Sequence, residues 1–179
     1  MTTAPLECPA IGATTTTTDD VAIRRATGAD AATVHTLVLE IAAHEGSVDQ
    51  VHVTPSGWGS LLERGDVVVL LAERAGRAVG YTSAVRRLHL WTGADVLAVD
   101  DVYVRPGERS AGVGRRLLTA MATIAEPEEW TLAWGVEPDN ARAQWFYTRL
   151  GATLRDKVVA VWTPAAYRKL LATETGEGR

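Results

Sequence analysis

The most informative segment of the chain reads Val104-Arg-Pro-Gly-Glu-Arg109-Ser-Ala-Gly112-Val-Gly114-Arg-Arg-Leu-Leu118. An apolar strand runs into a glycine-bearing loop and then into a helix predicted over residues 112–126. Backbone N–H groups at such a helix start have no partner within the helix, and the helix dipole there favours an anion. Gly112 and Gly114 keep side chains away from this point. The stretch therefore predicts a phosphate-binding loop, with positive charge supplied nearby by Arg109, Arg115 and Arg116.

Two better-known phosphate loops are excluded by their spacing. The chain has no Gly-Lys-Ser/Thr of the Walker A type. The glycines also do not follow the Gly-x-Gly-x-x-Gly pattern after a first strand, with an acidic residue about 20 positions on. From the loop alone, an ordinary surface helix that begins with two glycines stays an open alternative, because short glycine motifs often match by accident.

The segments around this loop predict an α/β (α+β) fold. Alternating or continuous apolar runs predict strands over residues 21–25, 66–74, 78–90, 94–104 and 130–136, and two short ones over 152–155 and 158–162. Helical spacing and capping residues predict helices that follow Asp30, Thr54 and Thr163, one that begins at Gly112, and one capped by Asp139 or Asn140. A run of antiparallel strands followed by strand–helix–strand crossovers gives a mixed, mostly antiparallel central sheet. We expect about six to seven strands with helices on both faces.

Composition and length place limits on the function. The 179 residues fit one domain. We predict that domain over residues 21–173, between a disordered Thr/Ala/Pro-rich tail at 1–20 and a polar tail at 174–179. A net charge of −4 argues against a nucleic-acid partner. The absence of a long apolar run and of a signal peptide predicts a cytoplasmic protein without membrane contact. No His or Cys residues lie at metal-ligand spacing, so no metal is predicted.

Two motifs resemble one known family. Arg109-x-x-Gly112-x-Gly114 is similar to the Arg/Gln-x-x-Gly-x-Gly/Ala signature of the GNAT superfamily of acyl-CoA N-acyltransferases, and it falls after the fourth strand, as in that family. The segment Asn140-Ala-Arg-Ala-Gln-Trp-Phe-Tyr147-Thr-Arg-Leu-Gly151-Ala resembles the family's Asn…Phe-Tyr-x-x-x-Gly-Phe/Ala segment. The order of elements agrees over residues 21–162, so the resemblance covers most of the chain.

The resemblance implies an enzyme that moves an acetyl group from acetyl-CoA to an amine by direct attack. It implies a splay between the strands at 94–104 and 130–136, which receives the pantetheine arm, and a backbone N–H near residues 102–104 that polarises the thioester carbonyl. Because the family often forms dimers, a homodimer is expected. The implied acetyl-CoA-binding residues are Val102, Tyr103, Val104, Arg109, Ser110, Ala111, Gly112, Val113, Gly114, Arg115 and Asn140.

Three residues are candidates for catalysis. Tyr147 matches the family's tyrosine, and a phenol with a pKa of ~10 can give a proton to the departing thiolate. The alternative is that Tyr147 is simply an aromatic residue of the core.

Asp100 and Asp101 are unusual because aspartate is disfavoured in strands. Strict alternation would point the two carboxylates to opposite faces, so that one of them faces the cleft and accepts a proton, directly or through water. Their alternative is a structural ion pair.

The acceptor prediction rests on a closer resemblance. Residues 39–46, Leu-Glu-Ile-Ala-Ala-His-Glu-Gly, and residues 100–104, Asp-Asp-Val-Tyr-Val, resemble segments of the spermidine/spermine (thialysine) N-acetyltransferase group. This predicts a small-molecule primary amine, polyamine-like or lysine-like, bound by Glu40, Glu45 and Asp49. The alternatives are an antibiotic or other amino metabolite, and a non-catalytic acyl-CoA-binding regulatory module. These acids also fit an ordinary solvated face.

Overall fold

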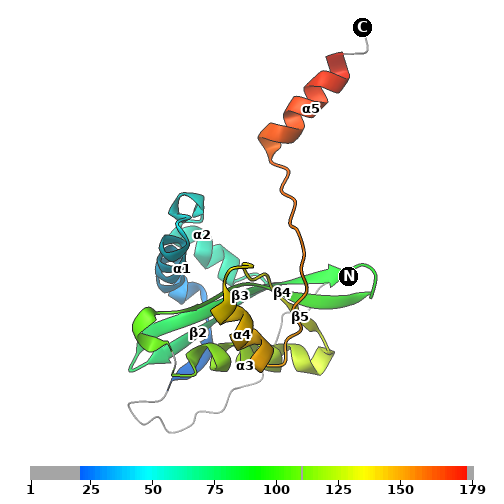
Figure 1. The fold of residues 1–179 in the computed structure, drawn as a ribbon. Coiled ribbons are helices and arrows are strands. Elements are labelled where there is room, and N and C mark those ends of the chain that lie inside the picture. Colours follow the sequence, from blue (N-terminus) through cyan, green and yellow to red (C-terminus); the bar gives the residue numbers. More distant parts are fainter. Residues whose placement is uncertain (1–20, 110, 177–179) are drawn as a thin grey trace. The chain divides into compact units, whose positions relative to one another are not determined.

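The computed structural model describes residues 21–109 and 111–176 (Figure 1). The chain divides into two compact units, Met1–Gly135 and Val136–Arg179. Both ends of the chain and Ser110 lie outside the described residues, so the predicted domain limits at residues 21 and 173 stay a prediction. Among the described helices, none is long and apolar enough to cross a membrane.

The first unit is built on a five-stranded sheet. Its order is β1-β2-β3-β4-β5. The strands are β1 (Ala22–Arg25), β2 (Val67–Arg74), β3 (Arg77–His89), β4 (Ala94–Val104) and β5 (Thr131–Ala133). The first four strands pair antiparallel and β5 pairs parallel with β4. This confirms the mixed, mostly antiparallel sheet, although it has fewer strands than the sequence predicted.

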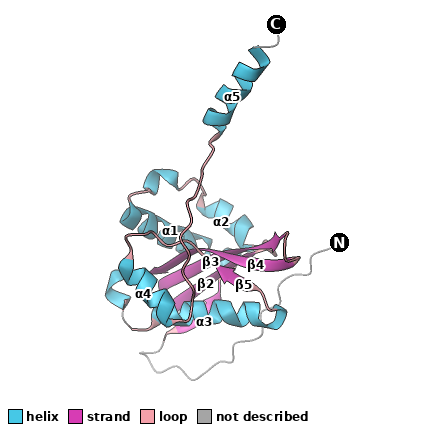
Figure 2. Ribbon diagram, turned by 45° about the vertical axis from the view of Figure 1, so that its right-hand side comes forward, coloured by secondary structure: helices cyan, strands magenta, loops and turns pink. Residues whose placement is uncertain are grey.

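Helices cover both faces of this sheet (Figure 2), as predicted. Alternate residues of β2 explain why, since Val68 and Leu70 enter one buried cluster and Val69 and Leu71 enter another. On one side the cluster includes α3 (Val113–Ala125), and on the other it includes α1 (Ala31–Glu45) and α2 (Pro55–Leu62). We call these the α3 side and the α1 side of the sheet.

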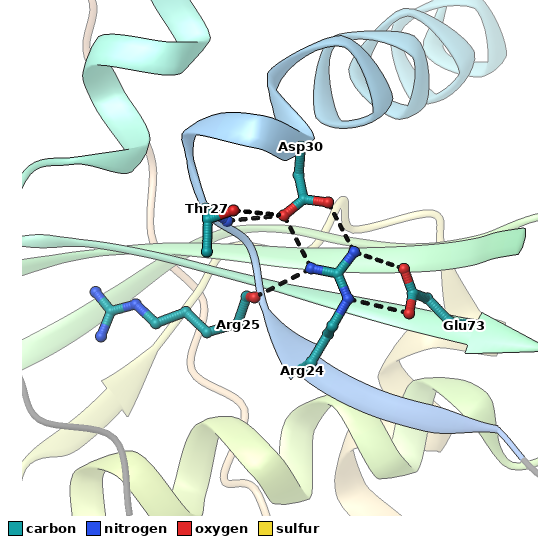
Figure 3. A network of polar contacts seen from close by, with 5 residues as sticks. All are labelled: Arg24, Arg25, Thr27, Asp30 and Glu73. Atoms are coloured by element: carbon teal, nitrogen blue, oxygen red, sulfur yellow. Dashed lines mark hydrogen bonds and ion pairs between the residues drawn. The ribbon is translucent and has the colours of Figure 1, made fainter. Parts of the chain in front are cut away.

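A charged network fixes the start of α1 against the edge of the sheet (Figure 3). The Arg24 guanidinium on β1 bonds both oxygens of Asp30, at 2.7 and 2.8 Å, and both oxygens of Glu73 on β2, at 2.6 and 3.0 Å. Asp30 also accepts a hydrogen bond from the backbone N–H of Thr27. Because hydrogen bonds favour the charged carboxylate, chiefly those from Arg24, the pKa of Asp30 lies well below its usual range.

The connection from β4 to α3 is fastened to the β2–β3 hairpin. Glu108, at the end of the short helix η3 (Pro106–Glu108), pairs with Arg74 and, at 3.0 Å, with Arg77. Further along the loop, the Arg109 Nε–H donates to the carbonyl oxygen of Val104 at 2.9 Å. The loop that enters α3 is therefore held against the end of β4.

The second unit contains α4 (Ala141–Arg149) and α5 (Pro164–Gly176). Asn140 caps α4 as predicted, since its Oδ1 accepts from the N–H of Ala143 at 3.1 Å. Gly151 follows the helix with a φ of +93°, the left-handed conformation in which a glycine commonly ends a helix.

The predictions of strands over residues 152–155 and 158–162 were wrong. The structure assigns no strand to residues 152–163. Alternating β-branched residues favour an extended backbone, but a strand also needs a hydrogen-bonded neighbour, which sequence alone does not supply. Val158 and Val161 are 94% and 81% exposed. The strand predicted over 130–136 is likewise shorter, because pairing with β4 ends at Ala133.

Candidate functional site

The start of α3 presents backbone donors to open space. Gly112 precedes the helix with a φ of +75°, and its carbonyl accepts the first helical hydrogen bond, from Arg116. The N–H groups of Val113, Gly114 and Arg115 belong to the first turn and so have no partner within the helix. Among the described residues, none has an atom within 4 Å of a Cβ atom added at Gly112. The glycine is thus required by its backbone conformation and not by a close contact.

The edge of β4 that faces away from β3 is paired over only part of its length. Pairing between β4 and β5 covers Val96–Ala98 and Thr131–Ala133 only. In the part of the chain that the structure describes, residues 99–104 of β4 therefore have no strand partner on that side. Their outward backbone groups form an unpaired edge, to which another extended chain can bond.

A β-bulge begins where the pairing with β5 ends. Ser83 pairs with Asp101 while Ala84 pairs with Val99, so Asp100 is an extra residue in β4. Bulges bend a strand and increase its twist. We therefore expect β4 to bend just after Ala98, the last of its residues that pairs with β5.

The bulge also brings the two aspartates to one face. Val99 and Val102 both pack on the α3 side, although the alternation of an uninterrupted strand would separate them. The two residues between them are therefore turned toward the α1 side. The expectation that Asp100 and Asp101 point to opposite faces was wrong, because two residues of a bulge oppose one residue of the neighbouring strand.

The two carboxylates differ in their surroundings. Asp101 is partly exposed, and its Oδ2 accepts a hydrogen bond from the Ser83 hydroxyl at 2.8 Å. Asp100 as a whole residue is exposed, yet its pKa is raised. The main cause is the desolvation of its carboxyl group, and the second is the negative charge of Asp101. A carboxyl group with a raised pKa is suited to accept a proton.

Tyr81 lies on β3, two residues from Ser83, the partner of Asp101. Its side chain is fully buried and belongs to the same cluster as Tyr103, whose ring centroid is 6.3 Å away. Burial, and next the charge of Asp101, raise the pKa of the Tyr81 phenol far above its usual value. The hydroxyl is directed at Asp101 but makes no well-formed hydrogen bond to any described residue. The Trp58 indole N–H, in the same cluster, is likewise buried without a partner in the described structure.

The acids predicted to bind the acceptor have different environments. The Arg105 guanidinium forms two hydrogen bonds with Glu40, at 2.7 and 2.9 Å, and for this reason above all the pKa of Glu40 is lowered. Tyr103 donates a third hydrogen bond to Glu40. Glu45 ends α1 and is exposed, and its charge contributes to the raised pKa of Tyr81. Asp49 is exposed in the short helix η2 (Val48–Gln50). Of the three, Glu40 is already neutralised by an internal partner.

Tyr147 lies in the second unit, on α4. It is buried, with its ring centroid 5.3 Å from that of Phe146, and burial raises the pKa of its phenol. The hydroxyl is therefore protonated at neutral pH, as a proton donor must be. The side-chain oxygen of Asn140 serves as the helix cap described above. The catalytic function of Tyr147 and the binding of acetyl-CoA by Asn140 stay predictions.

Sequence reasoning missed three residues of this region: Tyr81, Ser83 and Arg105. The first two belong to the run Tyr-Thr-Ser at the centre of the otherwise apolar strand β3. Polar groups in a buried strand are a usable signal, because each needs a partner. Arg105 had no comparable signal, since its partner Glu40 is 65 positions away.

Residues 35–152, more than half of the chain, match the acetyltransferase (GNAT) family. The chain belongs to this family. Its membership confirms the family predicted from the two motifs and, with it, the fold. The family uses acetyl-CoA as the acetyl donor.

Other GNAT proteins resemble the chain in part or in fold. A D-amino-acid N-acetyltransferase of Saccharomyces cerevisiae is 35% identical over 86 residues, which are 47% of this chain and 52% of that protein. The aligned stretch thus spans about half the length of this relative. An aminoglycoside acetyltransferase from an uncultured soil metagenomic sample has a TM-score of 0.70 at 17% identity, over 80% of this chain and 95% of that one. A ribosomal-protein-alanine N-acetyltransferase of Brucella melitensis has a TM-score of 0.66 at 21% identity, over 80% and 99%. The two solved structures share the fold.

Proposed function

We propose that this GNAT protein transfers the acetyl group of acetyl-CoA to a primary amine of a small molecule. The observation that supports this most directly is the arrangement along β4. The free helix start of α3, the unpaired edge at residues 99–104 and the carboxylates at the bulge follow one another in adjacent segments.

Acetyl-CoA fits the first two of these features. Its pyrophosphate would lie at the N–H groups of Val113, Gly114 and Arg115, where the helix dipole favours an anion. Arg109 and Arg115 add positive charge beside them. The pantetheine arm is an extended chain with amide groups, so the open edge of β4 suits it, and a backbone N–H near residues 102–104 would polarise the thioester carbonyl.

The reaction then proceeds by direct attack. Asp100 accepts a proton from the ammonium group of the acceptor, and the neutral amine attacks the thioester carbonyl carbon. A new C–N bond forms and the C–S bond breaks, so that coenzyme A leaves as a thiolate. The nitrogen loses its remaining extra proton to solvent as the amide forms, and Asp100 returns its proton to solvent before the next turnover. Tyr147 gives its proton to that thiolate and recovers one from solvent. The raised pKa of Asp100 and of Tyr147 suits these two functions.

For the acceptor, we propose an amine that carries a further cationic group, such as a polyamine or a lysine-like molecule. Asp100, Asp101 and Glu45 supply negative charge on the α1 side, whereas Glu40 contributes little because Arg105 neutralises it. The D-amino-acid and aminoglycoside acetyltransferases among the similar proteins support amino metabolites as the second candidate class. A cytoplasmic location and a homodimer stay predictions.

A charge variant at the helix start tests the binding of acetyl-CoA. Gly112→Asp places a negative charge beside the pyrophosphate, and Gly112→Asn is the matched control because both residues tolerate a left-handed φ and have equal size. Calorimetry should show acetyl-CoA binding about tenfold or more weaker in the Asp variant than in the Asn variant. Equal affinity in the two variants would refute the assigned pyrophosphate site.

A panel of amines tests the acceptor. Release of the coenzyme A thiol should be measured with spermidine, a lysine analogue, an aminoglycoside and a short peptide. We expect kcat/KM to be highest for the di- and polyamines, and the preference to shrink as salt is added, since salt screens exposed charges. A preference for the peptide, or indifference to acceptor charge, would contradict the proposal. If none of the amines in the panel leads to thiol release, the non-catalytic acyl-CoA-binding module is favoured instead.

A further inference from the structure

We propose that the turn between β3 and β4 inserts into an anionic lipid surface. We refer to residues 87–94, which read Arg-Leu-His-Leu-Trp-Thr-Gly-Ala, as the hairpin tip. The hairpin tip lies at the opposite end of β4 from the start of α3. Ala94 and Val104, the two ends of this strand, are about 30 Å apart. The lipid contact therefore does not depend on the proposed function.

The hairpin tip extends beyond the neighbouring strands of the sheet. The pairing of β3 with β2 ends at Val85, and the pairing of β4 with β5 begins at Val96. Among the described strands, residues 88–95 therefore pair only with each other (Figure 1). The N–H of Gly93 donates to the carbonyl oxygen of His89 at 2.9 Å, which closes the turn. The hairpin tip is thus an ordered, narrow and convex part of the molecule.

The apolar side chains of the hairpin tip are the most exposed ones described in the first unit. Trp91 is 96% exposed, Leu90 83% and Leu88 54%. The next most exposed large apolar side chain described in this unit is Val48, at 47%. Water around apolar groups is unfavourable, so an ordered turn that gathers three of them indicates a surface on which they are covered.

The charges of the hairpin tip favour an anionic surface. In a chain of net charge −4, the tip contains an arginine and no acidic residue. That arginine, Arg87, is exposed and forms no ion pair with a described residue. The acids beside the tip are already paired. Asp95 lies 3.7 Å from Arg86, and Asp66, whose carbonyl accepts from the Arg86 N–H, pairs with Arg64 at 2.6 Å.

A lipid surface suits the hairpin tip better than a protein does. A stable protein interface takes about 20–30 residues on each side, whereas the tip has eight. Two tips would also bring together the like charges of two Arg87 side chains. Tryptophan and leucine partition into the boundary between headgroups and acyl chains, and arginine contacts anionic headgroups. Such a contact needs no long apolar run, whose absence was the basis for expecting no membrane contact.

Sedimentation of the full-length protein with sucrose-loaded vesicles tests this contact. Vesicles of phosphatidylcholine with about 30% phosphatidylglycerol should bind the protein about three- to fivefold more tightly than phosphatidylcholine alone, and added salt should remove the difference. Trp91→Ala should weaken binding to both kinds of vesicle by at least about tenfold, because the indole is no longer there to be buried. Arg87→Gln should remove only the preference for the anionic vesicles.

Trp162→Ala is the matched control. Trp162 is also exposed, at 63%, but it belongs to the second unit and to the apolar segment 158–162. Binding of this variant should stay within about twofold of the wild type, since a single exposed apolar residue is not in itself a binding site. All three variants should keep the wild-type melting temperature, because the substituted side chains are exposed.

The proposal is overturned if anionic vesicles bind no protein, if Trp91→Ala binds like the wild type, or if Trp162→Ala loses as much binding as Trp91→Ala. Sedimentation velocity without vesicles tests the other occupant, a second copy of the chain. A dimer that Trp91→Ala converts to a monomer would assign the hairpin tip to an interface between copies and overturn the lipid contact. Neither measurement needs acetyl-CoA or an amine, so a failure of acetyl transfer would refute the proposed function without changing these results.

Discussion

Two groups of acidic residues lie on the same sheet, and they differ in whether a basic side chain pairs with them. At the edge strands β1 and β2, Asp30 and Glu73 share the Arg24 guanidinium through four hydrogen bonds of 2.6–3.0 Å (Figure 3). At the bulge of β4, Asp100 and Asp101 adjoin each other and form no ion pair with a described basic residue. Ser83 donates to Asp101, and the Tyr81 hydroxyl interacts with the same carboxylate. The first group is complete within the protein. The second has unused acceptors, which is the condition of a group that serves a ligand.

The same difference appears in the direction of the pKa shifts. Hydrogen bonds from Arg24 lower the pKa of Asp30, whereas desolvation and the adjacent Asp101 raise that of Asp100. A lowered pKa means that the folded state stabilises the anion, and a raised one means that it penalises the anion. Structural carboxylates belong to the first kind, and groups that exchange protons in a reaction often belong to the second.

The largest expected effect comes from the same substitution made in each group. Asp100→Asn keeps the size of the side chain and removes its ability to accept a proton. We expect kcat for acetyl transfer to fall by about 10²–10⁴-fold, with the melting temperature nearly unchanged. Asp30→Asn should leave kcat per folded molecule as it is. If the two variants lose activity equally, the assignment of a catalytic function to Asp100 and of a structural one to Asp30 is wrong.

The second effect is on stability. Asp30→Asn leaves Arg24 with one carboxylate partner, so the free energy of unfolding should fall by about 1–3 kcal/mol in urea denaturation. Since the folded-state pKa of Asp30 lies below its unfolded value of about 3.9, its stabilisation is complete above that pH and is lost as the pH falls below it. The wild type should therefore lose more stability in acid than the variant does. Parallel curves would contradict the assignment.

The smallest effect is a displacement of a pH profile. Asp100 must be ionised to accept a proton, so kcat should fall as the pH drops through its raised pKa. Asp101→Asn removes the neighbouring negative charge that contributes to this raised pKa. The acidic limb of kcat should then move to lower pH when the acceptor is saturating. An unmoved limb would show that the two carboxylates do not interact.

Local signals in the sequence were sufficient for much of the fold. Glycine and capping residues predicted where helices begin, and Gly112 and Asn140 occupy the predicted positions. These features depend on a few neighbouring residues, so the sequence contains their whole cause. The continuous apolar run of β2 likewise predicted a strand, and the structure buries it on both faces.

Features that depend on distant partners were not predictable. The run Val-Asp-Asp-Val at residues 99–102 is compatible with an unbroken strand, and only the register against β3 makes Asp100 the extra residue. The pairing of Glu40 with Arg105 was invisible for the same reason. Val158 and Val161 illustrate the opposite error, since their local preference for an extended backbone did not produce a strand.

The bulge in β4 also determines how this strand can change during evolution. Before Asp100, odd-numbered positions such as Leu97 and Val99 fill the α3 side, and after it even-numbered positions such as Val102 and Val104 do so. Loss of the Asp100 codon would restore a regular alternation, in which Val99, Val102 and Val104 keep the α3 side and Tyr103 keeps the α1 side. The strand thus holds one residue more than its two faces require. That residue can be substituted, or lost, without exchanging the layers of the core, whereas a deletion elsewhere in β4 would need the bulge to move or disappear.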